Sequence, residues 1–411
     1  MTDQCRHVLS LYSRSAATEA NECRNTCGVI SADSPRYLGF IPAAPTKAAL
    51  LFDMLISCAS IQGISWLEAA GAIHAENLVL RLIAARAGLP DSAGGCFVSG
   101  GSAGNLSALV VAREVAKRKA GYAGRGRRFR VAVSTDAHSS IVNTMRILEM
   151  DPLTVATDDH RLTGVALRAA IEADGDPSSL AAVVATAGTT NAGIIDDLAG
   201  AAAVAREHGL WLHVDGAYGG AGLFAPSVRA AYDGIEHADS FVVDPHKWLF
   251  APFDCAALLY RDPAAARRAH AQHAPYLDPI RANEAWDPAD YAYQLTRRVR
   301  GLPFWFSLAV HGTDAYRAGI EATLDIARDA ASRIQAAPHL ELVLDPELTV
   351  VVFRRLGWDA EQNQAWSDTM LRDQRAFVLP TTHHGESVLR MVFLHPECPP
   401  SVTDDVIASL A

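Results

Sequence analysis

Residues 210–220 read LWLHVDGAYGG, an apolar strand that ends on Asp215 and continues into a glycine-rich turn. Residues 240–248, SFVVDPHKW, follow the same plan, with an acid, a histidine and a lysine directly after the apolar run. Short strands that are apolar at almost every position are typical of parallel sheets buried on both faces. The two stretches therefore predict an α/β fold whose polar side chains gather where the strands end.

Outward from these stretches, apolar segments alternate with helix-like segments at the spacing of parallel strand–helix–strand units. The other strands are expected at residues 129–134, 153–156, 181–186 and 256–260, and helices at 139–149, 163–173 and 197–208. This order predicts a doubly wound α/β domain with a mostly parallel sheet.

The chain changes character on both sides of this domain. Residues 45–89 and 303–336 have apolar residues at helical spacing. Beyond them we expect a smaller α+β unit with an antiparallel sheet, with strands at 340–354, 376–381 and 388–394 and helices at 359–374 and 401–410. The predicted regions are an N-terminal helical segment (1–89), a large α/β domain (90–305) and a small C-terminal α+β domain (306–411).

The composition is that of a globular protein with a large core. Half of the 411 residues are apolar and 20% are charged, which excludes a disordered chain. The net charge of −10 argues against a broad surface for nucleic acid or anionic membranes. The basic run at residues 117–130 is therefore interpreted as a helix end followed by a solvated loop.

The sequence also predicts a cytoplasmic location without a membrane partner. Seven cysteines form no regular framework and are read as reduced thiols, and the first ten residues lack the apolar core of a signal peptide. The longest apolar stretch, Met54–Leu67, is too short to cross a bilayer and is predicted to be a buried helix.

Four groups of residues suggest chemistry. Residues 98–105, VSGGSAGN, can hold an anion between glycine backbone and a helix N-terminus, although they match neither Walker A nor GxGxxG. Residues 136–140, DAHSS, place His138 directly after a strand. Asp215 can pair with a cationic ring nitrogen. Lys247 is suited to forming a Schiff base. Each has a structural explanation when taken alone, as a turn, a cap or a loop lysine. Together they provide what pyridoxal phosphate requires.

Five segments then resemble the motifs of the group II pyridoxal-phosphate-dependent amino acid decarboxylases, which include aromatic amino acid, glutamate and histidine decarboxylases. They are SGGSAGNLSAL (99–109), DAHSS (136–140), TAGTTNAGIIDDL (186–198), WLHVDGAYGG (211–220) and DPHKWLF (244–250). The resemblance implies a fold-type I enzyme and a homodimer with active sites at the subunit interface. Residues 1–89 would contribute to the dimer and the substrate pocket.

The resemblance also implies roles for single residues. Lys247 would hold the cofactor as an aldimine, Asp215 would pair with the pyridine nitrogen and His138 would stack on the ring. Asp244 stands where many relatives have Asn, so it is left outside the phosphate shell. The implied cofactor-binding residues are Gly100, Gly101, Ser102, His138, Thr190, Asp215, Ala217, His246 and Lys247.

Tyr276 matches the catalytic-loop tyrosine of the family, which is thought to protonate Cα of the quinonoid intermediate after CO₂ leaves. The alternative is a loop aromatic in a packing role. The surrounding residues 261–290 have no clear periodicity and suit a lid that closes over the site. The implied catalytic set is Lys247, Asp215, His138 and Tyr276.

The substrate pocket is implied to include segments that relatives receive from the neighbouring subunit. The aliphatic residues in it do not indicate a pocket built for a large aromatic ring. Arg390 either meets an acidic substrate side chain or pairs within the small domain. The implied pocket residues are Phe40, Ile41, Pro42, Gln62, Ile64 and Arg390.

No metal site is predicted. Cys23 and Cys27 have no second pair of ligands nearby, and the pair His383-His384 has no third ligand at metal spacing, so a loop is expected there.

The resemblance thus implies decarboxylation of an L-amino acid to the amine and CO₂. Other pyridoxal-phosphate reactions remain open on the same fold: decarboxylation with oxidative deamination to an aldehyde, carbon–carbon lysis or transamination. A catalytically silent binding subunit is a further alternative. A nucleotide-binding dehydrogenase would leave Lys247 unexplained.

Overall fold

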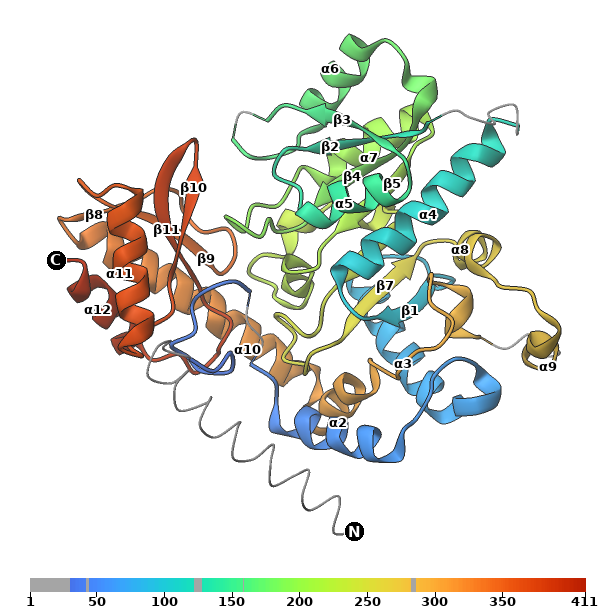
Figure 1. Cartoon of the computed structure of the whole chain (residues 1–411), viewed down its shortest axis with the longest axis horizontal. Helices are drawn as coiled ribbons and strands as arrows, with labels where there is room; N and C mark the ends of the chain where they lie inside the picture. Colours follow the sequence, from blue (N-terminus) through green and yellow to red (C-terminus); the bar gives the residue numbers. More distant parts are fainter. Residues whose placement is uncertain (1–29, 42–43, 122–127, 158, 282–285) are drawn as a thin grey trace, which may run out of the picture.

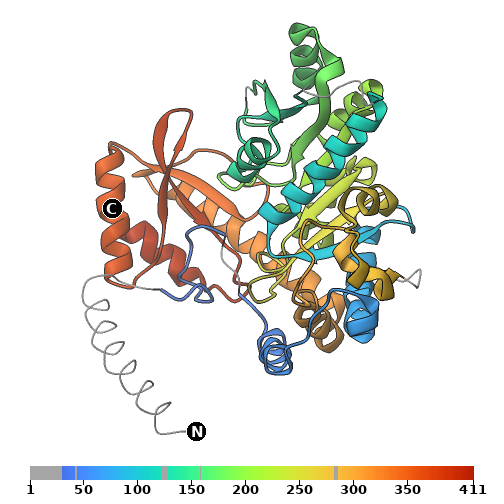
Figure 2. The same cartoon turned by 45° about the vertical axis from the view of Figure 1, so that its right-hand side comes forward.

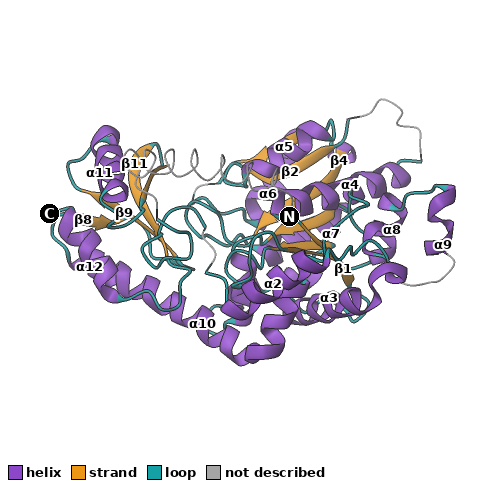
Figure 3. Cartoon of the chain, turned by 60° about the horizontal axis from the view of Figure 1, so that its bottom comes forward, coloured by secondary structure: helices purple, strands orange, loops and turns teal. Residues whose placement is uncertain are grey.

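The structure, a computed structural model, describes residues 30–41, 44–121, 128–157, 159–281 and 286–411. Its larger part is built on a seven-stranded sheet and its smaller part on a four-stranded sheet. The long helix α10 (Leu302–Ala336) runs from one part to the other (Figures 1 and 3). A mostly parallel sheet together with a small antiparallel one confirms the predicted fold class.

The strands of the large sheet lie in the order β1-β7-β6-β5-β4-β2-β3. Neighbours from β6 to β3 are parallel, whereas β7 is antiparallel to both β6 and β1. The strands are β1 (Gly94–Val98), β2 (Arg130–Ser134), β3 (Asp151–Val155), β4 (Leu180–Thr186), β5 (Trp211–Asp215), β6 (Ser240–Val243) and β7 (Ala256–Tyr260). All six strands expected in this region are therefore present, with bounds that differ by at most a few residues.

Strand β1 was not expected from the sequence, because it begins with two glycines and glycine is depleted in strands. A Cβ atom at Gly95 would lie 1.8 Å from the carbonyl oxygen of Leu258 in β7. The close approach of β1 to β7 therefore requires glycine at this position.

Helices cover both faces of the large sheet (Figure 2). One face packs against α4 (Gly101–Lys119), α5 (Ser139–Ile147) and α8 (Pro263–His270), and the other against α3 (Trp66–Arg86), α6 (Gly164–Asp174) and α7 (Leu198–His208). Successive side chains of a strand enter the two cores alternately. This double coverage explains why the strands are apolar at almost every position.

The prediction of a buried helix over residues 54–67 is wrong. Helix α2 (Lys47–Ala59) ends before α3 begins, and Phe52 of α2 stacks on Phe306 of α10 with ring centroids 4.1 Å apart. The opposite side of α2 remains apolar and exposed. This α2 face consists of Leu50, Leu51, Met54 and Leu55, with exposed fractions of 39%, 65%, 61% and 56%.

The small sheet has the order β10-β11-β9-β8 and is antiparallel throughout. Its strands are β8 (Leu340–Leu342), β9 (Val350–Arg355), β10 (Leu379–His383) and β11 (Glu386–Val392), and its helices are α11 (Ala360–Arg372) and α12 (Pro400–Ser409). The single strand predicted over residues 340–354 is thus two strands, β8 and β9.

Both faces of the small sheet are buried. Val350 and Val352 of β9 join the core that also contains β4, β5 and α7, whereas Val351 and Phe353 join the core formed with α10, α11 and α12. The period of two along the strand therefore divides its side chains between two cores, one of which is shared with the large domain.

None of the helices in the described part of the chain combines the length and hydropathy needed to cross a bilayer.

Candidate active site

The carboxyl ends of the parallel strands open into a cavity of about 370 Å³. This is the place where open α/β sheets bind ligands, and the volume is in the range of small-molecule sites. The cavity is lined by all nine expected cofactor-binding residues: Gly100, Gly101, Ser102, His138, Thr190, Asp215, Ala217, His246 and Lys247.

One end of the cavity is the first turn of α4. A Cβ atom at Gly101 would lie 2.8 Å from the Cβ of Ala217 and 3.2 Å from Oδ2 of Asp244, so glycine is required there. The N–H of Gly101 donates to Asp244 Oδ2 at 3.0 Å. Ser102 follows with an exposed side chain, and helix geometry leaves its N–H without an intrahelical acceptor. This turn therefore offers donors to an anion.

Asp244, only 2% exposed, lies beneath this end of the cavity. Its Oδ2 is 3.1 Å from Lys247 Nζ and 3.4 Å from His246 Nε2. Burial lowers the pKa of His246, and its Nδ1 accepts from the N–H of Cys255 at 2.9 Å, so the neutral ring carries its proton on Nε2, toward Asp244. Asp244 Oδ1 is buried without a hydrogen-bond partner among the described residues. The carboxylate thus binds the amine and the helix turn together.

The Asp215 carboxylate is fixed by a chain of buried hydrogen bonds. Trp211 Nε1 donates to Ser240 Oγ at 2.8 Å, and Ser240 and His213 Nδ1 are 2.8 Å apart. His213 Nε2 contacts Asn105 Oδ1 at 2.8 Å, and Asn105 Nδ2 donates to Asp215 Oδ2 at 2.9 Å. Burial lowers the pKa of His213 to about 4. The neutral ring therefore accepts from Ser240 at Nδ1 and donates to Asn105 from Nε2.

His138 faces the same cavity from the start of α5. Its Nδ1 accepts from the backbone N–H of Ser140 at 3.2 Å and lies 2.9 Å from the Ser140 hydroxyl. Asn105 Nδ2 also donates to that hydroxyl, at 2.9 Å. One amide group therefore positions both the carboxylate of Asp215 and the cap that holds His138.

Asn105, His213 and Ser140 were not among the site residues expected from the sequence. The period of two along β5 places His213 on the same face as Asp215, and one helical turn separates Asn105 from Gly101. These spacings could have indicated both residues. The contact of Asn105 with Ser140 depends on how α4 packs against α5, which no local pattern reveals.

Tyr276 does not line the cavity. It lies on the short turn η5 (Pro275–Leu277), directly before α9 (Asp278–Arg281) at the edge of the molecule, and is 71% exposed (Figure 1). The structure therefore does not bring Tyr276 together with Lys247 in a single protomer.

The expected substrate-pocket residues also lie outside this cavity, and Pro42 falls outside the described residues, as do Cys23 and Cys27. Arg390 Nη2 donates to the carbonyl of Phe40 at 2.7 Å, and Ile41 packs against the main core. Gln62 forms a bridge with Arg298, and the carbonyl of Ile64 accepts from the N–H of Ala289 at 3.3 Å. The five described residues thus do not form one pocket within a protomer.

Arg390 is buried, with 6% of its surface exposed. Burial lowers its pKa to about 10, and its Nε has no hydrogen-bond partner among the described residues. The structure shows no acidic partner for it within the described part of the small domain.

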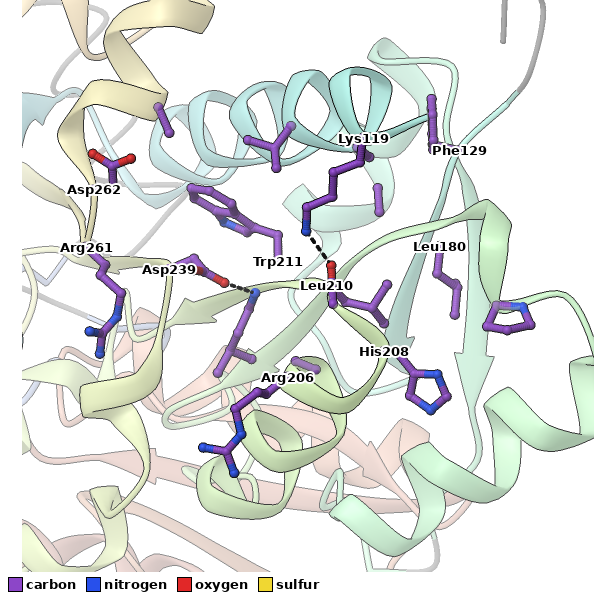
Figure 4. A pocket seen from close by; sticks show the side chains of 18 of the residues that line it. Lys119, Phe129, Leu180, Arg206, His208, Leu210, Trp211, Asp239, Arg261 and Asp262 are labelled. Carbon is purple, nitrogen blue, oxygen red and sulfur yellow. Dashed lines mark hydrogen bonds between the residues drawn. The ribbon is translucent and has the colours of Figure 1, made fainter. Parts of the chain in front are cut away.

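A larger cavity, of about 780 Å³, lies at the opposite edge of the sheet, where β2, β4 and β5 begin (Figure 4). Two of its polar side chains bind the backbone: Lys119 Nζ donates to the carbonyl of Gly209 at 2.7 Å, and Asp239 accepts from the N–H of Leu212 at 2.8 Å. None of the expected site residues lines it.

Known proteins resemble the whole chain. A family model described as the pyridoxal-dependent decarboxylase conserved domain matches residues 20–356. An aromatic-L-amino-acid decarboxylase from Bacillus atrophaeus is 31% identical over 87% of this chain and 74% of its own. An L-2,4-diaminobutyrate decarboxylase from Rhizobium meliloti is 33% identical over 92% of this chain and 77% of its own. The solved structure of Oryza sativa TDC with PLP and tryptamine has a TM-score of 0.87 and 25% identity, and the match covers 96% of this chain and 87% of that one.

The buried chain of hydrogen bonds leads to a prediction about pH. Because the pKa of His213 is lower in the folded protein than in the unfolded chain, its contribution to stability is present above about pH 6.5 and is lost as the pH falls toward 4. In His213→Gln, the free energy of unfolding should fall less steeply between pH 7 and pH 4.5, by up to about 1.4 kcal/mol per pH unit. Urea denaturation at several pH values, followed by circular dichroism, measures the slope.

His237→Gln is the matched control, because the side chain of His237 is 53% exposed, and its slope should equal that of the wild type. An unchanged slope in His213→Gln would contradict a neutral, buried His213.

Proposed function

Because the chain belongs to the family of pyridoxal-dependent decarboxylases, we propose that it uses pyridoxal phosphate to release the α-carboxyl group of an L-amino acid as CO₂, leaving the amine. The observation that carries the proposal is the single cavity that collects a lysine amine, a buried carboxylate, an imidazole and a helix N-terminus. These groups lie at or just after the carboxyl ends of four strands, β1, β2, β5 and β6.

The residues of the cavity fit this cofactor. The exposed first turn of α4 suits one phosphate group, and Asp215, fixed by Asn105, suits a protonated ring nitrogen. Bound there, pyridoxal phosphate supplies an electron sink for the pair of electrons left when CO₂ departs. We assign Gly100, Gly101, Ser102 and His246 to the phosphate, and His138, Thr190 and Ala217 to the ring.

Lys247 is assigned to hold the cofactor aldehyde through its amine. Asp244 keeps that amine at the floor of the cavity, 3.1 Å from its own Oδ2. The same carboxylate accepts from the N–H of Gly101, so Gly101 is assigned to border the phosphate without donating to it, and Ser102 is assigned as a donor. Asp244 therefore positions the lysine and does not bind the phosphate.

Lys247→Ala tests the assignment of the amine. Wild-type protein should show the visible absorption band of a cofactor bound to a lysine. The variant should lack this band, because the alanine side chain is a methyl group and has no amine to bind the aldehyde. Lys117→Ala, on the exposed end of α4, should keep the band. A band that survives in Lys247→Ala would remove the central assignment.

The reaction itself is measured by the release of CO₂ and amine from a panel of aromatic, basic and acidic amino acids and histidine. At least one should be decarboxylated by the wild type and not by Lys247→Ala. If no amino acid of the panel releases CO₂ or amine, the result would favour a binding subunit over an enzyme.

Tyr276 is proposed as the proton donor to Cα. Since it lies outside the cavity in one protomer, the η5–α9 segment must close over the site, or a second subunit must bring its own copy. The predicted lid, Arg261 to Asp290, contains this segment, but its helix α8 packs against the large sheet and is left out of the proposed closure. A hydroxyl delivered in this way would protonate Cα only after CO₂ has left and the site has closed.

Tyr276→Phe should keep the cofactor band but lose about 10²-fold or more in the rate of amine formation, because a positioned general acid contributes that much. Product should shift toward the aldehyde, with consumption of O₂. Chromatography of both products measures the ratio, and Tyr293→Phe, half exposed, is the control. If the amine-to-aldehyde ratio of Tyr276→Phe equals that of the wild type, Tyr276 is not the proton donor.

We also propose a homodimer whose interface includes residues 1–89 and the α2 face. Contiguous exposed apolar side chains of this kind mark interaction surfaces. The proposed pocket residues Phe40, Ile41, Gln62 and Ile64 lie in the same region and outside the cavity of their own protomer. In a dimer they would complete the substrate pocket of the partner. Arg390, whose Nε has no hydrogen-bond partner among the described residues, is proposed to meet an acidic side chain of the substrate.

The double variant Leu51→Glu/Met54→Glu should convert the dimer to a monomer, because two carboxylates would be buried without partners. Light scattering after size exclusion gives the mass, and decarboxylation should fall with it. Val165→Glu/Leu356→Glu adds the same charge at exposed apolar positions elsewhere and should leave the mass unchanged. A wild-type monomer, or a double variant of wild-type mass, would overturn the proposal.

A further inference from the structure

Three histidines from distant parts of the chain meet at the junction of the two sheets. His160 lies in the loop between β3 and α6, His383 ends β10, and His384 lies in the turn to β11. Their ring centroids are 4.5 Å, 4.4 Å and 4.4 Å apart, and one nitrogen from each lies within 4.8 Å of the others. The expectation that His383-His384 has no third ligand is therefore corrected: the third histidine comes from a loop more than 200 residues earlier.

We propose that this tri-histidine cluster binds a divalent transition metal ion, with Zn²⁺ as the expected ion. Imidazole nitrogens suit the later first-row metals, and three histidines with one open position form a recurrent zinc site. The fourth ligand would be water, since His384 is exposed to solvent. No metal binding by these residues is needed for the proposed decarboxylation.

The geometry requires only a small contraction. A tetrahedral ion with bonds of about 2.0–2.1 Å places its ligand nitrogens about 3.4 Å apart. The nitrogens of the cluster, at most 4.8 Å apart, must therefore close by about 1.4 Å or less. Side-chain rotation in two connecting loops can supply that movement.

A carboxylate already orients the first histidine. Asp136 Oδ1 lies 2.7 Å from His160 Nδ1, and Asp136 Oδ2 accepts from the hydroxyl of Thr157 at 3.3 Å. Asp136 therefore engages Nδ1, which leaves Nε2 as the nitrogen that a metal ion would bind. A histidine held by a carboxylate in this way is the usual arrangement at protein metal sites.

The Nε2 nitrogen of His160 lacks a partner in the described part of the chain. His160 Nε2 is buried and forms no hydrogen bond with the described residues. A buried polar atom without a partner is costly, and its position in a group of three imidazoles points to a cation as the missing partner.

Two of the three histidines have a left-handed backbone conformation, which is uncommon for residues other than glycine. His383 pairs with Glu386, so His384 and Gly385 form a two-residue hairpin loop, and both have positive φ, 49° and 79°. Such a turn favours Asn or Gly at its first position. His160 also has a positive φ, 55°. Both histidines therefore have a backbone conformation that few non-glycine residues adopt.

A bound ion would join the small domain to the wall of the active site. Asn191 already spans this junction, because its Oδ1 accepts from the hydroxyl of Thr381 at 2.7 Å and its Nδ2 donates to the carbonyl of Thr382 at 3.1 Å. Thr190, beside it, lines the cofactor cavity, and Asp136 is two residues before His138. The metal would thus hold the loops that carry His138 and Thr190.

The experiment uses holoenzyme without an affinity tag, treated with chelator and desalted, because tags and free cofactor both bind metals. Co²⁺ is titrated and followed by its visible d–d bands, and Zn²⁺ is then added as competitor. We expect one equivalent of Co²⁺ per chain with the intense bands of a four-coordinate site, displaced by Zn²⁺. The cofactor band serves as a check that the metal does not act at Lys247.

Variants distinguish a built site from surface binding. His160→Gln and His384→Gln should abolish stoichiometric binding, and Asp136→Asn should weaken it by about 10- to 100-fold, as loss of such a carboxylate does. His311→Gln, exposed on α10, should bind as the wild type does. Since His384 lies in an exposed turn, its variant should remain folded, which circular dichroism checks.

The outcomes either support or overturn metal binding by the tri-histidine cluster. Loss of Co²⁺ binding in His160→Gln and His384→Gln, with His311→Gln intact, supports the site. A wild type that retains less than one equivalent, or cluster variants that bind like the wild type, overturns it. The decarboxylase proposal depends on Lys247, so it is tested independently of the metal site.

Discussion

The position of the Asp215 carboxylate depends on the amide of Asn105, and much of the site depends on both. Asn105 Nδ2 donates to Asp215 and to Ser140, which in turn holds His138. Asn105 lies one helical turn after Gly101, so the rise of α4 fixes Gly101 and the residue that binds the carboxylate at about 6 Å from each other along the helix. A rigid ligand with an anionic group and a cationic ring nitrogen needs such a fixed separation.

The same interaction explains how the site can hold a charged carboxylate in a buried position. A buried carboxylate is tolerated only when its oxygens are bonded. Asp215 receives one bond from Asn105 and one from the N–H of Ala217 at 3.1 Å, while His213 stays neutral behind Asn105. Charge is therefore confined to the groups that face the cavity, and the layer behind them is neutral.

Local patterns in the sequence predicted much of this molecule. The apolar runs before Asp215 and Lys247 were sufficient to predict the sheet. The nine expected cofactor-binding residues came from the resemblance to known decarboxylases, and they line one cavity because strand ends of a parallel sheet meet at one edge. The patterns failed where tertiary contacts decide. Gly95 suggests a turn until β7 is seen to lie against it, and Met54 suggests a core position until α2 is seen to present it to solvent. His160 could not be linked to His383 by any spacing, since their loops meet only after both sheets have formed.

Both faces of the small sheet being buried has a consequence for cooperativity. Val350 and Val352 belong to the core of the large domain, so opening the small domain would expose part of that core to water. Domains separated by a polar linker can unfold in turn, but two sheets that share apolar side chains lose those contacts together. The predicted boundary near residue 305 falls within α10, which continues to Ala336, so the free energy that maintains the fold is shared by the parts on either side of it.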